Sequence, residues 1–140
     1  MKVREIMHHA EYAPAGLSVA EAARLMEQKQ LDSMLVKQAG AIGIFTERDI
    51  LRKVVARGRD PAQVSVSEIM SSPLHTIDVE HGAEEASELM ERHCIRRLVA
   101  IDRGGIAGIV SASCIARNLK YITARRLLHA QLGTGFSAVQ

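Results

Sequence analysis

The sequence predicts an α/β (α+β) fold in which two half-domains of β-α-β-β-α order are related by a pseudo-twofold axis and pack through their sheets. The first observation is an internal repeat, since residues 3–7 (VREIM) return as residues 66–70 (VSEIM). The second is that both copies show helix-period and strand-period patterns in the same order. The third is size. A half-domain of about sixty residues is only marginally stable alone, so the two copies are expected to bury their apolar faces against each other.

Each copy first predicts an amphipathic helix. In the first copy, Ser18 and Glu21 have the spacing of a capping box. An apolar stripe with helical spacing follows and ends near Gln30. The stripe consists of Ala22, Leu25 and Met26 in the first copy and of Ala83, Ala86, Leu89 and Met90 in the second.

Two short strands around a glycine-containing turn come next in each copy. The predicted pairs are residues 34–36 with 42–45 and residues 98–101 with 106–110. Short extended segments near Pro14 and at residues 75–77 can add a further strand to each pair. The offset between the copies rises from 64 residues at Leu25 to 65 at Gly43. We place this extra residue in the second turn, at 102–105, because solvated turns tolerate insertions.

A second helix closes each copy. Thr46 has the position of an N-cap, with Asp49 three residues on, and Gly58 ends the pattern. The expected helix face is Ile50, Leu51, Val54 and Val55 in the first copy, echoed by Ser111, Ile115, Ala116 and Leu119 in the second. The predicted division is therefore a first domain at 1–60, a second at 61–120, and a C-terminal helical extension and tail at 121–140.

Composition narrows the classes of function. The net charge of +2 is too small to indicate nucleic-acid binding, and an aromatic content of 3% without tryptophan leaves few residues for base stacking. No apolar run approaches a membrane span, and the N-terminus lacks the apolar core of a signal peptide. We expect a cytoplasmic protein that engages neither membrane nor nucleic acid.

Nothing in the sequence requires catalysis. Cys94 and Cys114 stand alone, which favours buried free thiols, and no activating base lies near either in sequence. The adjacent His8 and His9 diverge in a strand or a helix, which argues against a shared metal. We expect no enzyme, no metal site and no obligatory cofactor.

The duplicated VREIM and VSEIM openings, together with residues 43–49 (GIFTERD), resemble a pair of CBS domains. The resemblance runs from residue 3 to about residue 120. It implies a regulatory module that binds an adenosyl compound, namely AMP, ADP, ATP or S-adenosylmethionine, in a cleft between the two half-domains. It also implies a homodimer and a regulated protein that the sequence does not identify.

The resemblance points to a Gly-x-x-Thr-x-x-Asp pattern that Gly43, Thr46 and Asp49 complete. It implies that the Asp49 carboxylate accepts hydrogen bonds from the ribose hydroxyls, which charge assistance would strengthen. Thr46 and free backbone N–H groups at the helix start would face phosphate, and Gly43 would allow close approach. The same residues also suit a plain helix N-terminus, with Thr46 as the cap. Both interpretations stay open.

The second copy is unequal to the first. Ser111 can still meet a phosphate, but Cys114 stands where the acid would be and is a weak acceptor. We therefore expect one good adenosyl site per chain. Further candidates are Arg48, which would face the same cleft, Thr76 and Ile77, which would line an adenine pocket, and Arg96 and Arg97, which would face phosphates or solvent.

An alternative is an interaction or scaffold protein with a vestigial ligand cleft. The missing acid in the second copy and the apolar Ile122, Leu127 and Leu128 of the extension favour it. Its partner would bind regardless of nucleotide.

Overall fold

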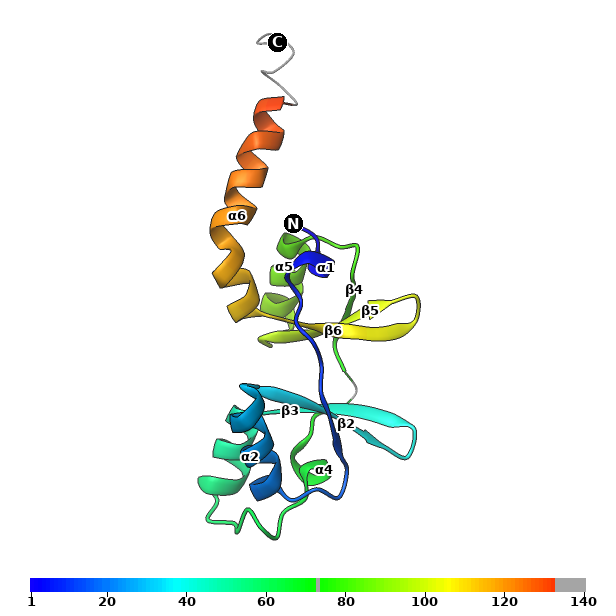
Figure 1. The fold of residues 1–140 in the computed structure, drawn as a ribbon, viewed down its shortest axis with the longest axis vertical. Coiled ribbons are helices and arrows are strands. Elements are labelled where there is room, and N and C mark those ends of the chain that lie inside the picture. Colours follow the sequence, from blue (N-terminus) through cyan, green and yellow to red (C-terminus); the bar gives the residue numbers. More distant parts are fainter. Residues whose placement is uncertain (73, 133–140) are drawn as a thin grey trace. The chain divides into compact units, whose positions relative to one another are not determined.

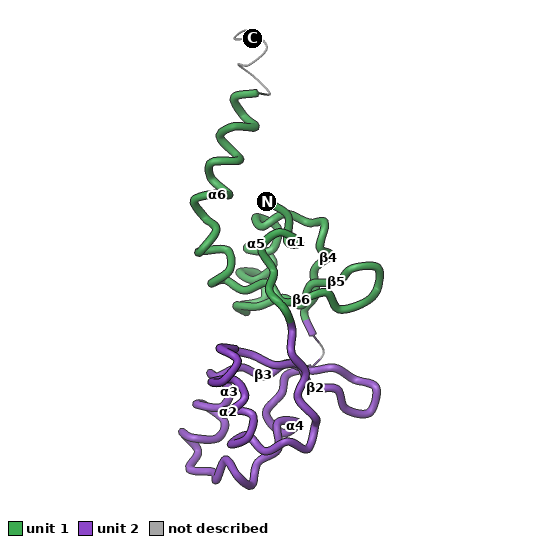
Figure 2. Tube along the Cα trace, viewed as in Figure 1, with its two compact units in different colours: residues 1–9, 75–140 green, residues 10–74 purple. Residues whose placement is uncertain are grey.

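The computed structural model describes residues 1–72 and 74–132. The chain forms two compact units, one of residues 10–74 and the other of residues 1–9 together with the chain from residue 75 onward (Figure 2). The tail predicted at the C-terminus lies, from residue 133, outside the described residues.

The continuous unit contains the first copy of the repeat (Figure 1). Its sheet has the order β1-β2-β3, with β1 parallel and β3 antiparallel to β2. Apolar side chains of the sheet and helices form its core, among them Met34, Val36, Phe45 and Val54. The elements are β1 (Tyr12–Pro14), α2 (Val19–Lys29), β2 (Ser33–Gln38), β3 (Ala41–Thr46), α3 (Glu47–Ile50), a π-helical turn (Leu51–Val55) and α4 (Val66–Ile69).

The other unit contains the second copy and repeats this order, with a sheet β4-β5-β6 of the same topology. The predicted β-α-β-β-α order is confirmed in both copies, including the short strands β1 and β4. Its elements are α1 (Val3–Ile6), β4 (Thr76–Asp78), α5 (Ala83–His93), β5 (Arg97–Asp102), β6 (Gly105–Ser111) and α6 (Ala112–Ala130).

The short helix before each copy packs with the other copy. Val3 and Ile6 of α1 are buried in the cluster that holds Ile77, and α1 is anchored by the backbone bond from Val3 N to His81 O at 2.8 Å. Val66 of α4 is buried in the cluster of the first copy. The compact units therefore differ from the division at residue 60 that the repeat predicts, because each four-residue helix buries its apolar side against the neighbouring copy.

The inserted residue is a β-bulge, and its predicted place in the turn is wrong. Both hairpins turn through two residues with positive φ, Ala39 (50°) and Gly40 (81°) in one and Arg103 (52°) and Gly104 (81°) in the other. The turns are thus equal in length. The register shifts instead after the pair Ala100–Gly108, so that Ala107 is the additional residue in β6.

The predicted helix face after Thr46 is only partly correct. Val54 is buried, but Leu51 and Val55 are 57% and 59% exposed. The reason is the π-helical turn, closed by the bond from Ala56 N to Leu51 O at 2.8 Å. Its wider spacing rotates these two side chains away from the core.

Helix α6 carries the second copy into the predicted extension as far as Ala130. Ile122 is buried against its own unit, whereas Tyr121, Leu127 and Leu128 are exposed. Within the described residues, no helix has both the length and the apolar character that crossing a membrane requires.

Candidate functional site

Thr46 and Asp49 form a reciprocal cap at the junction of β3 and α3. The Thr46 N–H donates to Asp49 Oδ2 at 2.9 Å, and the Thr46 hydroxyl donates to the same oxygen at 3.2 Å. In return, the Asp49 N–H lies 3.3 Å from Thr46 Oγ1. The capping role left open by the sequence is present, and it holds the carboxylate in one orientation.

The free backbone N–H groups predicted at this helix start are largely used within the unit. Those of Thr46 and Asp49 belong to the cap, and the Glu47 N–H donates to Asp32 O at 3.0 Å. The expectation that these amides await a phosphate is wrong for these three positions.

Lys53 is the neighbour of Asp49 that sequence reasoning missed. Its ammonium lies 3.1 Å from Asp49 Oδ1 and donates to the carbonyl of Ile69 at 2.9 Å. The Asp49 side chain is 20% exposed and that of Lys53 is 42% exposed. The i, i+4 spacing of an acid and a lysine was the available signal.

Gly43 is needed by the chain itself. A Cβ at this position would lie 2.7 Å from Met70 Sδ and 2.9 Å from Ser71 O. The segment after α4 comes this close because Ser71 pairs with Ile44 through two backbone bonds, of 2.8 and 3.0 Å. The predicted close approach at Gly43 exists, and what approaches is residues 70–71.

Ser33 is a second residue that the sequence analysis did not name. It pairs with Thr46 across β2 and β3, so the two side chains share one face of the sheet. Its side chain is 3% exposed, and its hydroxyl has no hydrogen-bond partner among the described residues. A buried hydroxyl without a partner costs about 1–3 kcal/mol, so this position favours a polar neighbour.

The remaining candidates are dispersed. Arg48 is exposed on α3, and Thr76 is exposed on β4. Ile77 is 4% exposed and belongs to the hydrophobic core of its unit. Arg96 is exposed, and its carbonyl accepts from Ala112 N at 2.8 Å, while Arg97 is partly buried opposite Ser111.

The second copy repeats the cap with a thiol in place of the acid. The Cys114 N–H donates to Ser111 Oγ at 3.1 Å, and the Ser111 hydroxyl donates to Cys114 Sγ at 3.1 Å. Arg117 Nη2 lies 3.7 Å from the same sulfur. Cys114 is thus buried, as expected, but Cys94 is exposed and ends α5 with a φ of 54°, which corrects that prediction.

Cys114 has an acidic thiol. Burial raises its pKa, but hydrogen bonds from His8 and Ser111 outweigh burial and lower the pKa from 9.0 to about 6. His8 is brought there by two backbone bonds with Ile109, each of 2.9 Å. The sequence analysis found no base near Cys114 because His8 is far away along the chain.

This pKa makes the stability depend on pH. The folded value lies below the ordinary value of an unfolded thiol, about 8.5, so the stabilisation is complete above that value and is lost as the pH falls through 6. Between pH 6 and pH 8, we expect the wild type to gain on the order of 1–2 kcal/mol relative to Cys114→Ser. Urea denaturation at several pH values measures this, and parallel profiles for the two proteins would contradict it.

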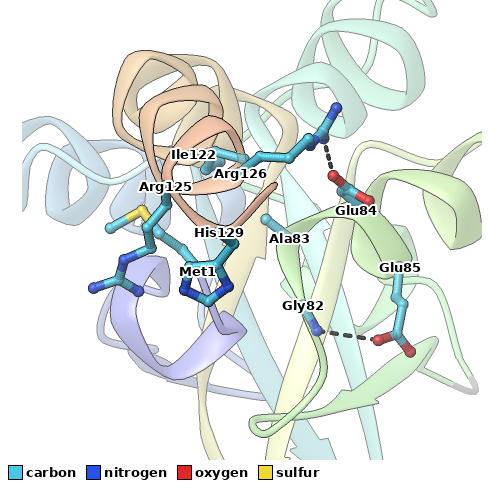
Figure 3. A pocket seen from close by; sticks show the side chains of 9 residues that line it. All are labelled: Met1, Gly82, Ala83, Glu84, Glu85, Ile122, Arg125, Arg126 and His129. Atoms are coloured by element: carbon cyan, nitrogen blue, oxygen red, sulfur yellow. Dashed lines mark hydrogen bonds and ion pairs between the residues drawn. The ribbon is translucent and has the colours of Figure 1, made fainter. Parts of the chain in front are cut away.

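A pocket of about 220 Å³ lies between α5 and α6 and includes none of the predicted site residues (Figure 3). Its two arginines already have acidic partners: Arg126 pairs with Glu84, and Arg125 Nη1 lies 2.9 Å from Glu5 Oε1. The described residues contain no group of three or more histidine, cysteine or acidic side chains suited to a metal.

Comparison with known proteins decides the family. Residues 3–56 and 66–121 each match the model of the CBS domain. The chain belongs to the CBS domain family. CBS domain pairs are generally regulatory and ligand-binding rather than enzymatic.

Several CBS proteins are similar to this chain. It is 39% identical over 102 residues to the CBS domain-containing protein YhcV of Bacillus subtilis. The matched region covers 72% of this chain and 72% of that protein. It is 34% identical over 77 residues to Hypoxic response protein 1 of Mycobacterium tuberculosis, or 55% of this chain and about half (54%) of that protein. The structure of a hexameric CBS-CP12 protein from bloom-forming cyanobacteria has a TM-score of 0.80 at 29% identity, over 98% of this chain and 91% of that one.

Proposed function

We propose that this CBS pair is a regulatory module that binds an adenosyl compound at Thr46 and Asp49. The observation that carries the proposal is the Asp49 carboxylate, which Thr46 holds through Oδ2 while Oδ1 faces Lys53 on the partly exposed side. A fixed, partly exposed carboxylate suits a ribose hydroxyl, because charge-assisted hydrogen bonds are stronger than neutral ones. Binding would bias the action of a regulated protein.

Ser33 supports a polar ligand at the same place. Its buried hydroxyl lies on the face that carries Thr46 and has no partner within the described part of the chain. A ligand oxygen or nitrogen beside Thr46 would give it one.

The second copy supports one such site per chain. Cys114 replaces the acid, and its sulfur is already engaged by Ser111 and Arg117. In our proposal Ser111 therefore acts as a cap, and the adenosyl ligand binds at the first copy.

We expect a melting shift with an adenosyl compound that depends on Asp49. A ligand at 100 times its dissociation constant stabilises the folded state by about 2.7 kcal/mol, or several degrees in Tm. Asp49→Asn should weaken binding by about 1–3 kcal/mol because it removes a charged acceptor. Thermal scans with AMP, ADP, ATP and S-adenosylmethionine, followed by calorimetry on the variant, measure both.

Glu47→Gln is the matched control, because it removes an exposed acid two residues away that takes no part in the cap. Circular dichroism establishes that both variants fold. Absence of any shift in the wild type would refute the proposed function. Equal affinities of Asp49→Asn and Glu47→Gln would refute the role of Asp49.

We also propose that the module self-associates, as a homodimer or larger ring, through α6. A similar CBS protein is hexameric. Four large apolar residues of α6 are more than half exposed, namely Leu119, Tyr121, Leu127 and Leu128. Leu127→Glu should lower the mass found by sedimentation, because an acid replaces an apolar contact. Gln28→Glu, at an exposed position of α2, is the control, and an unchanged mass for Leu127→Glu would count against this surface.

A further inference from the structure

Lys53 is the cation that lies beside the Asp49 carboxylate. It lies in the π-helical turn after α3, and its ammonium is fixed at two points, 3.1 Å from Asp49 Oδ1 and 2.9 Å from Ile69 O. An ammonium has three N–H groups, so at least one remains for another acceptor. With 42% of the side chain exposed, that acceptor can come from solvent.

The two copies differ at this position in the same way as at the acid. The offset of 65 residues that relates Asp49 to Cys114 relates Lys53 to Asn118. Asn118 donates to the carbonyl of Cys114 at 2.8 Å and carries no charge. The copy that lacks the carboxylate therefore also lacks the ammonium, so the pair of charges is present only in the first copy.

The position of Lys53 determines which charge a ligand can carry. A ligand hydroxyl bound to Asp49 Oδ1 places the rest of a small ligand within several ångströms of the ammonium. Two unit charges about 6 Å apart change a binding constant about 3-fold in a water-like medium and about 100-fold at the lower dielectric of a protein surface. An anion gains by this factor, and a cation loses by it.

We propose that Lys53 makes the Asp49 site selective for anionic adenosyl compounds, the adenosine phosphates, over neutral adenosine and the cationic sulfonium of S-adenosylmethionine. The inference rests on the proposed function, and it names the ligand class of that site. In the free protein Lys53 neutralises Asp49, and in the complex its remaining N–H faces the phosphate.

Calorimetry with AMP, adenosine and S-adenosylmethionine tests the inference. For the wild type, we expect AMP to bind about 10-fold tighter than adenosine, and S-adenosylmethionine to bind more weakly than adenosine. In Lys53→Met the ratio of AMP to adenosine affinity should fall toward one. Lys53→Arg should restore most of the ratio, because it keeps the charge.

Arg52→Met is the matched control, since it removes an exposed cation from the adjacent position of the same turn. The ratio should stay near the wild-type value in this variant. An unchanged ratio in Lys53→Met, or tighter binding of all three compounds, would overturn the inference while leaving adenosyl binding intact. Failure of the wild type to bind any of them would instead refute the proposed function, and the inference with it.

Discussion

Replacement of Phe45 by alanine is expected to lower the free energy of unfolding by about 3–5 kcal/mol. Phe45 is fully buried in β3 and belongs to the cluster that contains Met34, Val36 and Val54. Removing its ring forfeits the free energy of burying those atoms and leaves a cavity among the buried side chains of the cluster. Urea denaturation followed by circular dichroism measures the loss.

Val110→Ala is the matched control, because Val110 is the fully buried counterpart of Phe45 in β6. It should cost less, since fewer atoms are removed. If Phe45→Ala cost less than Val110→Ala, the packing described for the first copy would be contradicted.

A methyl group at Gly108 is expected to destabilise the chain by about 2–4 kcal/mol, the sum of overpacking and weakened backbone bonds. The Cβ would lie 2.6 Å from the carbonyl oxygen of His8, which is backbone and cannot rotate away. His8 would have to move, and its two bonds with Ile109 would weaken. Gly108→Ala should therefore reduce the hydrogen-exchange protection of the His8 and Ile109 amides as well as the stability.

Gly105→Ala tests the same substitution at the first residue of β6. There the nearest atom is 3.7 Å away, which is an ordinary contact, so only a small effect is expected. Similar losses for the two variants would mean that the approach of His8 to Gly108 is not the cause.

Local rules predicted the local parts of the fold. The Ser18 cap, the end of α2 near Gln30 and the paired strands all depend on residues near one another in the sequence. The bulge at Ala107 was misplaced because a turn and a bulge absorb an insertion equally well in an alignment. The exposure of Leu51 and Val55 was missed because a π-helical turn has no sequence signature in a period-3.6 pattern.

The local contacts of the candidate site were predictable from the sequence, and its long-range contacts were not. Thr46 and Asp49 interact over three residues, and their pairing could be read from spacing. The contact between Lys53 and Ile69 depends on where α4 packs, and the contact of His8 with Cys114 depends on the β-bridge to Ile109. No pattern within one segment encodes these distances, because they arise only when separate segments meet.

The exchanged positions of α1 and α4 set an order for synthesis. The unit of residues 10–74 is continuous, so all of its sheet and its α4 are available before residue 75 is made. The other unit needs residues 1–9 and residues from 75 onward. Val3 and Ile6 are therefore synthesised before the continuous unit, but the partners that bury them are synthesised after it.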